Sequence, residues 1–342
     1  MLRLEGSFQS KPEIAVREGN ILAASFHLIL LRKLGGSESF KDKQEFFNNR
    51  LLAYHEARGA RHSPLYLRVS RDDIVGSSYR ATRYDYHDIL KPFRILCLRS
   101  IISRWFSESD WCRLFLVEFE NEPGLDQGGV RREWFELLCR RLLHPELGLF
   151  VSIEDNSEAV FPNPRPPQEV RMKMYKFAGH VVGKCLYESA HGRTYAQHLP
   201  ARLAKSFLAQ LVGLRVHYKH FSDDAPQLYN SKIKFIEENT VEDLELTFSD
   251  EEFGSDGNLV RNVDLKPSGS QRAVTDENKL EYLDLLAQER LSNRIRQQTE
   301  HFLQGLHLFV PDSLLALFDE SGMEFFNAIK YKLPKTTYSL NT

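Results

Sequence analysis

The stretch from Leu114 to Phe135 constrains the fold more than any other part of the chain. It begins with Leu114–Phe119, a short apolar run typical of a buried strand. Gly128 and Gly129 then mark a turn, because glycine allows a positive φ and a close approach of the backbone. Apolar residues recur at helical spacing after the turn, at Val130, Trp134, Leu137 and Leu138. The pattern therefore predicts a strand, a glycine turn and a helix with one buried face.

Two simpler interpretations compete for this turn. A phosphate-binding loop needs Lys followed by Ser or Thr directly after its last glycine, so that these side chains reach the phosphates and magnesium. Val130 and Arg131 stand in those places, which argues against a nucleotide site. The other interpretation is a tight connection with no role in binding, and the local pattern alone favours it. We expect no cofactor.

Length and charge limit the class of protein. The 342 residues are enough for one large domain or two ordinary ones. A net charge of -2 provides no broad basic field, so neither nucleic acid nor a membrane surface is expected as a partner. The strongest apolar run, Ile21–Leu31, is too short to span a bilayer. It predicts a helix that ends at Gly35 and Gly36 and packs on the rest of the chain.

The cysteines and histidines indicate no metal site. Four cysteines lie far apart, without a C-x-x-C pair, at Cys97, Cys112, Cys139 and Cys185. This spacing supports neither a zinc ribbon nor a thioredoxin-type redox centre. Their apolar neighbours predict buried, reduced thiols, as in a cytoplasmic protein. His217 and His220 are three residues apart but have no apparent third ligand, so we expect no bound metal.

Several sequence strings identify a family. The turn and helix carry the string Gly124-x-Asp126-x-Gly128-Gly129-x-x-Arg132-Glu133-Trp134-Phe135. It resembles the opening motif of the HECT ubiquitin ligases, which lies in their N-terminal lobe. Further strings resemble that family in the same order: MYKFAGHVVGKCLYE at 174–188, V-T-x-x-N-K-x-x-Y at 274–282, and Val310-Pro311. The resemblance implies an α+β fold, mostly helical, with a large and a small subdomain, and a function in protein ubiquitination as a ubiquitin-protein transferase.

The resemblance also implies a division of the chain. Residues 1–64 are expected to form an N-terminal helical extension, residues 65–320 the HECT N-lobe, and residues 321–342 a tail outside the family. Residues 84–106 depart from the family as an insert, which is either an extra helix or sequence that is not normally translated. On the helix expected at 174–188, Gly179 and Gly183 are four residues apart and would let another backbone pack closely.

The small subdomain, about residues 223–260, is the position at which the family binds a ubiquitin-conjugating enzyme. The apolar candidates for this docking groove are Leu228, Tyr229, Ile233, Phe235, Ile236, Leu244 and Leu246. Carboxylates at the rim would complement a basic partner, namely those of Glu237, Glu238, Glu242 and Asp243. Each apolar candidate could equally fill the core of the subdomain.

No catalytic residue is assigned. The family's nucleophile is a cysteine in a C-terminal lobe, followed by Leu-Pro, and no cysteine follows Cys185 here. Leu333-Pro334 lacks the preceding cysteine, and the apolar helix face around Cys185 favours a structural thiol. We therefore expect a chain truncated before the catalytic lobe, one that recruits a conjugating enzyme without forming a ubiquitin thioester. The alternatives are a module that competes for conjugating enzymes and a helical scaffold. The substrate protein is not predicted.

Overall fold

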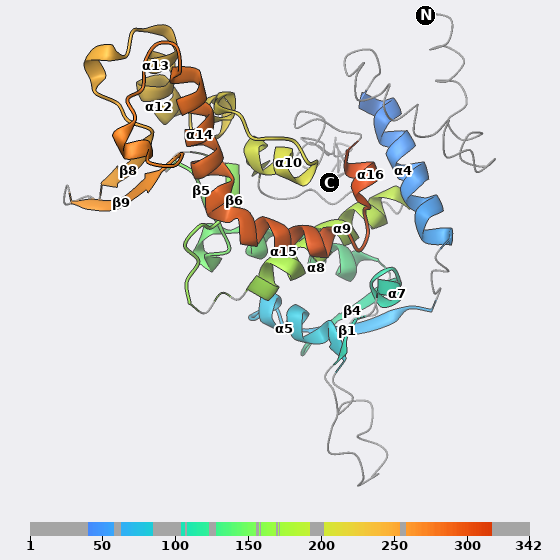
Figure 1. Ribbon diagram of the computed structural model, residues 1–342. Coiled ribbons are helices and arrows are strands. Elements are labelled where there is room, and N and C mark those ends of the chain that lie inside the picture. The colour runs from blue at the N-terminus through green and yellow to red at the C-terminus, as the bar shows by residue number, and fades with distance from the viewer. Residues whose placement is uncertain are drawn as a thin grey trace, which may run out of the picture.

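The computed structural model describes residues 40–57, 63–84, 104–106, 108–122, 128–154, 157, 159–168, 170, 172–191, 202–253 and 258–316 (Figure 1). These residues are mostly helical, with short strands in separate small sheets, which confirms the expected α+β class. The helix predicted at Ile21–Leu31, most of the insert 84–106 and the tail 321–342 lie outside the described residues.

The first elements of the chain pack around one large hydrophobic cluster, the main core. In chain order they are α4 (Phe40–Ala57), β1 (Leu65–Val69), α5 (Ile74–Ala81), β2 (Arg83–Tyr84), β3 (Arg104–Trp105), α7 (Glu108–Trp111), β4 (Phe115–Phe119), α8 (Gly129–Leu143), η1 (Pro145–Leu147), β5 (Phe150–Ser152), β6 (Ala159–Pro162), α9 (Met172–Ala190), β7 (Arg202–Leu203) and α10 (Lys205–Leu211). Strand β1 pairs with β4 in parallel, β2 with β3 antiparallel, and β6 lies between β5 and β7.

Later elements form a second core, built from buried residues between Val216 and Leu291. They are η2 (Tyr218–His220), α11 (Phe221–Asp224), α12 (Pro226–Leu228), η3 (Tyr229–Ile233), α13 (Lys234–Glu238), η4 (Glu242–Leu244), β8 (Ser249–Phe253), β9 (Leu259–Asp264), η5 (Gly269–Gln271) and α14 (Lys279–Leu291). The chain then returns to the main core through η6 (Asn293–Ile295), α15 (Arg296–Leu306) and α16 (Asp312–Leu315). Figure 1 shows α12, α13, α14, β8 and β9 gathered on one side, away from α4 and α16.

The strand, turn and helix predicted around Gly128 are confirmed. Gly128 has a φ of 105°, a left-handed conformation that favours glycine, and it directly precedes α8. On α8, Trp134 is 1% exposed and its indole Nε1 donates to Ser78 Oγ at 2.8 Å. Leu138 is fully buried on the same face. The predicted buried face therefore anchors α8 in the main core.

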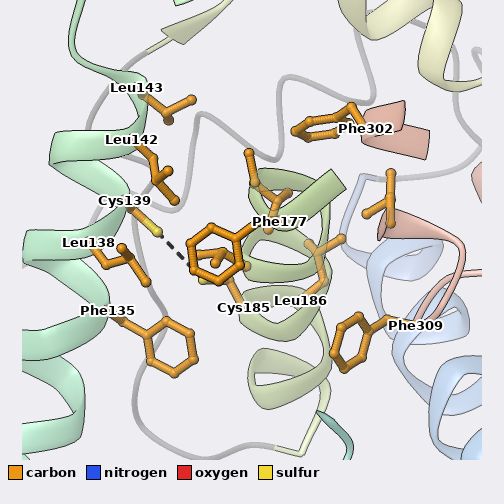
Figure 2. Close-up of a cluster of buried hydrophobic side chains, with 14 of the residues drawn as sticks. Phe135, Leu138, Cys139, Leu142, Leu143, Phe177, Cys185, Leu186, Phe302 and Phe309 are labelled. Atoms are coloured by element: carbon orange, nitrogen blue, oxygen red, sulfur yellow. Dashed lines mark hydrogen bonds between the residues drawn. The ribbon is translucent and has the colours of Figure 1, made fainter. Parts of the chain in front are cut away.

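Helix α9 lies at the centre of the main core, between α8 and α15. In Figure 2 Leu138 and Cys139 of α8 face the side chains of Phe177 and Cys185 on α9. On the α15 side, a Cβ added to Gly179 would overlap the backbone carbonyl oxygen of Phe302. The predicted close approach of another backbone is thus confirmed at Gly179. At Gly183 the neighbouring group is instead the ring of Phe309.

Candidate docking surface

The candidate surface is built on one continuous helical stretch, Pro226–Glu238, formed by α12, η3 and α13 and here named the docking helix. Its middle turn, Tyr229–Ile233, is π-helical. Such π-turns shift the register of a helix by a residue and occur frequently at functional sites. The stretch is anchored by Ala225 and Ile233, which are 1% and 0% exposed and belong to the second core.

Two of the predicted docking residues lie in the interior. Ile233 and Ile236 are 0% and 2% exposed and share the second core with Tyr282 and Leu286 of α14. A partner protein cannot reach side chains that are buried in this way. The assignment of these two residues to a docking groove is therefore corrected, and their role is to hold the docking helix against α14.

The other candidates remain at the surface. Phe235 is 49% exposed and Leu244 is 41% exposed. Leu228, Tyr229 and Leu246 are partly buried and pack against the second core. These five residues are named the docking face: Leu228, Tyr229, Phe235, Leu244 and Leu246.

The predicted rim carboxylates fall into two groups, one paired within the chain and the other exposed to solvent. The Glu237 carboxylate pairs with Lys219 Nζ and accepts a hydrogen bond from Tyr218 Oη at 2.9 Å. The hydrogen bond with Lys219 lowers the pKa of Glu237 below its ordinary value, so this carboxylate stays ionised and its charge is balanced by Lys219 within the chain. In contrast, four carboxylate residues are exposed around Phe235 and Leu244 in the sequence: Glu238, Glu242, Asp243 and Glu245. Glu238 lies 4.0 Å from Lys234 Nζ in an exposed ion pair, so Glu242, Asp243 and Glu245 provide most of the negative charge of the rim.

Two polar contacts fix the turn that joins α13 to η4. The Asp276 carboxylate accepts a hydrogen bond from the Val241 amide at 3.1 Å. Lys279 Nζ donates to the carbonyl oxygen of Asn239 at 2.6 Å. The turn is therefore tied to the start of α14, and it holds Leu244 in a fixed relation to Phe235.

None of the described cysteines is an accessible nucleophile. Cys112, Cys139 and Cys185 are buried and form no disulfide with one another, and the Cys112 sulfur lies 3.3 Å from His55 Nδ1. The Cys139 and Cys185 sulfurs lie 3.9 Å apart, and both this contact and burial raise the pKa of the Cys185 thiol well above its ordinary value. A thiol that stays protonated and buried does not attack a thioester. Cys97 lies outside the described residues.

Within the described residues no group of three or more His, Cys, Asp and Glu side chains could hold a metal ion. The His220 ring instead contacts the His217 backbone, and His217 Nδ1 accepts a hydrogen bond from the Lys219 amide at 3.3 Å. His217 Nε2 lies 3.3 Å from Asp284 Oδ1. No helix in the described part of the chain has the length and hydropathy needed to cross a bilayer.

Comparison with known proteins shows the family to which this chain belongs. The family model of the HECT domain, described as a ubiquitin-transferase, matches residues 136–327. This match covers more than half of the chain. The chain belongs to the HECT family of ubiquitin ligases. The expectation drawn from the Gly128 motif and the strings after it is thereby confirmed.

Individual relatives agree with the HECT assignment. The chain is 44% identical over 324 residues to apoptosis-resistant E3 ubiquitin protein ligase 1 of Homo sapiens, which covers 94% of this chain and 37% of that protein. It is 30% identical over 295 residues to the E3 ubiquitin-protein ligase HACE1 of Danio rerio, covering 84% of this chain and 29% of the relative. A TOM1-like E3 ubiquitin-protein ligase of Neurospora crassa is also 30% identical, over 288 residues. The chain thus spans 37% or less of the length of these HECT relatives.

Proposed function

We propose that this HECT chain recruits a ubiquitin-conjugating enzyme through the docking face. The observation that carries the proposal is the exposure of Phe235 and Leu244, two large apolar side chains on the docking helix and on the turn that follows it. Exposed apolar groups with a polar rim are characteristic of protein interfaces. In HECT ligases this part of the chain binds the conjugating enzyme. That position in the family supports the choice of partner.

Charge supports the same partner class. The exposed carboxylates Glu238, Glu242, Asp243 and Glu245 favour a partner with a basic surface beside its apolar contact residues. The apolar contacts would supply most of the binding energy, whereas the carboxylates would mainly raise the association rate. Because a conjugating enzyme must leave to be recharged, we expect weak binding, with a Kd on the order of micromolar or above.

The proposal extends to the organisation of the chain. We assign residues 1–64 to an N-terminal extension and residues 65–327 to the N-lobe, because the HECT match continues to residue 327, past the boundary at 320 expected from sequence. The second core supports a small docking subdomain, and its residues from Val216 to Leu291 extend beyond the span of about 223–260 expected from sequence. The buried thiols, which form no disulfide with one another, support a reducing compartment such as the cytoplasm.

Titration of the chain against a panel of ubiquitin-conjugating enzymes tests the proposal. Binding should weaken as salt is added, because the rim carboxylates are exposed to solvent. Amide hydrogen exchange should slow in residues 226–246 when the partner is bound. Tight binding that protects only α4 or α8 would place the interface elsewhere. Absence of binding to every member of the panel by the folded chain would instead favour a helical scaffold.

A further inference from the structure

Glu154, which follows strand β5 at the edge of the main core, holds the start of the docking helix. Its carboxylate accepts hydrogen bonds from the backbone amides of Gln227 at 3.1 Å and Leu228 at 2.9 Å. Pro226 occupies the first helical position and has no N–H, and Ala225 before it provides no side-chain cap. The first donors of the docking helix are therefore satisfied by a residue more than seventy positions away.

A second carboxylate crosses the same junction in the opposite direction. Asp224 is the last residue of α11, whose first residue, Phe221, belongs to the second core. The Asp224 carboxylate oxygens accept hydrogen bonds from the amides of Lys205 at 2.7 Å and Ser206 at 2.8 Å. These amides begin α10, which packs in the main core and has no cap from its own preceding residue, Ala204. Each core therefore supplies a carboxylate that caps a helix of the other core.

Apolar packing is incomplete beside the Glu154 cap. A pocket of about 400 Å³ lies there between residues of the two cores, and Glu252, Arg290 and Arg294 are among the residues that line it. Phe161 lines it from the main core, and Phe221, Leu228 and Leu291 line it from the other side. Ile153 packs against both cores, but the cavity limits how much apolar surface can fix their relative orientation. Ile233 and Ile236 fix the later part of the docking helix against α14, whereas its start is tied to the main core by the hydrogen bonds of Glu154.

We propose that Glu154 is a positioning residue that sets the orientation of the docking helix, with Asp224 acting from the opposite side of the junction. This inference rests on the docking function proposed above. While the two amides are held, the helix presents Leu228 and Phe235 in one arrangement. When they are released, the helix samples other arrangements, and the observed affinity for a conjugating enzyme falls by the fraction that remains competent.

The test compares Glu154→Gln with Glu146→Gln in the full chain. Glutamine has the length of glutamate but keeps only one acceptor oxygen and no charge. Glu146 is a matched control on η1, because its carboxylate pairs locally with Arg141 and His144. Glu154→Gln should raise the Kd for a conjugating enzyme roughly threefold to tenfold, as expected for loss of a helix cap. Glu146→Gln should leave the Kd unchanged.

Amide exchange separates positioning from a general loss of stability. In Glu154→Gln the amides of Gln227 and Leu228 should exchange faster, while those of α14 stay as in Glu146→Gln. The thermal unfolding midpoint should fall by no more than a few degrees, as expected for the loss of one cap. Glu154→Asp is a second variant that keeps the charge but shortens the side chain. It should show the same loss, because its carboxylate no longer reaches both amides.

Equal affinity and equal exchange in Glu154→Gln and Glu146→Gln would overturn the inference. If the unmodified chain binds no conjugating enzyme, the docking function itself fails. In that case exchange at Gln227 and Leu228 alone decides whether Glu154 anchors the helix. Faster exchange in Glu154→Gln would support the anchor, and unchanged exchange would refute it.

Discussion

The backbone of Gly179 in α9 lies directly against the backbone carbonyl of Phe302 in α15. An alanine methyl group at Gly179 would overlap that carbonyl, so the two helices would have to separate. Gly179→Ala should therefore lower the free energy of unfolding by about 1–3 kcal/mol, despite the better helix propensity of alanine. Urea denaturation measures this change.

Gly129 offers the matched control for this substitution. It begins α8, and a Cβ at that position would meet no atom within 4 Å. Gly129→Ala should be neutral or slightly stabilising. If Gly179→Ala were equally neutral, α9 and α15 would not approach as closely as described.

Trp134 should be a principal stabilising residue of the main core. Its side chain is 1% exposed and its indole donates to Ser78 Oγ. Trp134→Ala should cost about 3–5 kcal/mol, because it removes a large buried ring and leaves a cavity. Glu136→Ala on the exposed side of α8 should change stability by no more than about 0.5 kcal/mol. An unfolding midpoint for Trp134→Ala equal to that of Glu136→Ala would show that α8 is not anchored through its indole.

Trp134 and Gly179 also show what could be predicted from the sequence. Trp134 and Leu138 recur at helical spacing after a glycine turn, and a helix on that pattern must bury them. Gly179 lacks a side chain in an otherwise apolar helix, which indicates close packing but not the identity of the neighbour. The buried ion pair of Lys184 with Glu188, at 2.6 Å and 0% and 1% side-chain exposure, could not be predicted, since burial of charges depends on distant elements.

The docking surface was predicted only in part, for a physical reason. Ile233 and Phe235 are two positions apart, which places them on nearly opposite sides of a helix. That spacing shows that Ile233 and Phe235 cannot share one buried face, but it does not show which of the two is buried. The π-turn before Lys234 shifts the register and is not evident from the apolar pattern. The cap by Glu154 joins segments that are distant in sequence, so it follows only from the fold.

His180 should make the stability of the fold depend on pH. Burial lowers the pKa of His180 to about 3 in the folded chain, from an ordinary value of 6.5. The contribution of His180 to the free energy of unfolding is therefore complete above pH 6.5. It is lost as the pH falls from 6.5 towards 3, because over that range only the unfolded chain takes up the proton. This residue should reduce the free energy of unfolding by about 2 kcal/mol between pH 7.5 and pH 5.

Replacement of the ring isolates this effect. His180→Phe should remove that part of the decrease measured by urea denaturation at the two pH values. His144→Phe should retain it, because His144 is exposed. A decrease of the same size in His180→Phe would show that other groups account for the acid sensitivity.

The described thiols should not accept ubiquitin. Cys112, Cys139 and Cys185 are buried, and the pKa of Cys185 is raised by its contact with Cys139 and by burial. A conjugating enzyme charged with ubiquitin and mixed with residues 1–342 should give no reductant-sensitive adduct with the chain. Cys97→Ser is assayed in parallel, since Cys97 lies outside the described residues. An adduct that disappears in one of the four Cys→Ser variants would identify that cysteine as the acceptor.

The affinity of Phe235→Ala for a ubiquitin-conjugating enzyme tests the docking proposal most directly. Phe235 is 49% exposed on the docking face, and Tyr66 is 79% exposed on β1 of the main core, so neither substitution should unfold the chain. By calorimetric titration, Phe235→Ala should raise the Kd roughly tenfold or more, as for a central interface residue, and Tyr66→Ala should leave it unchanged. A Kd for Phe235→Ala within about twofold of the unmodified chain would contradict docking through this face.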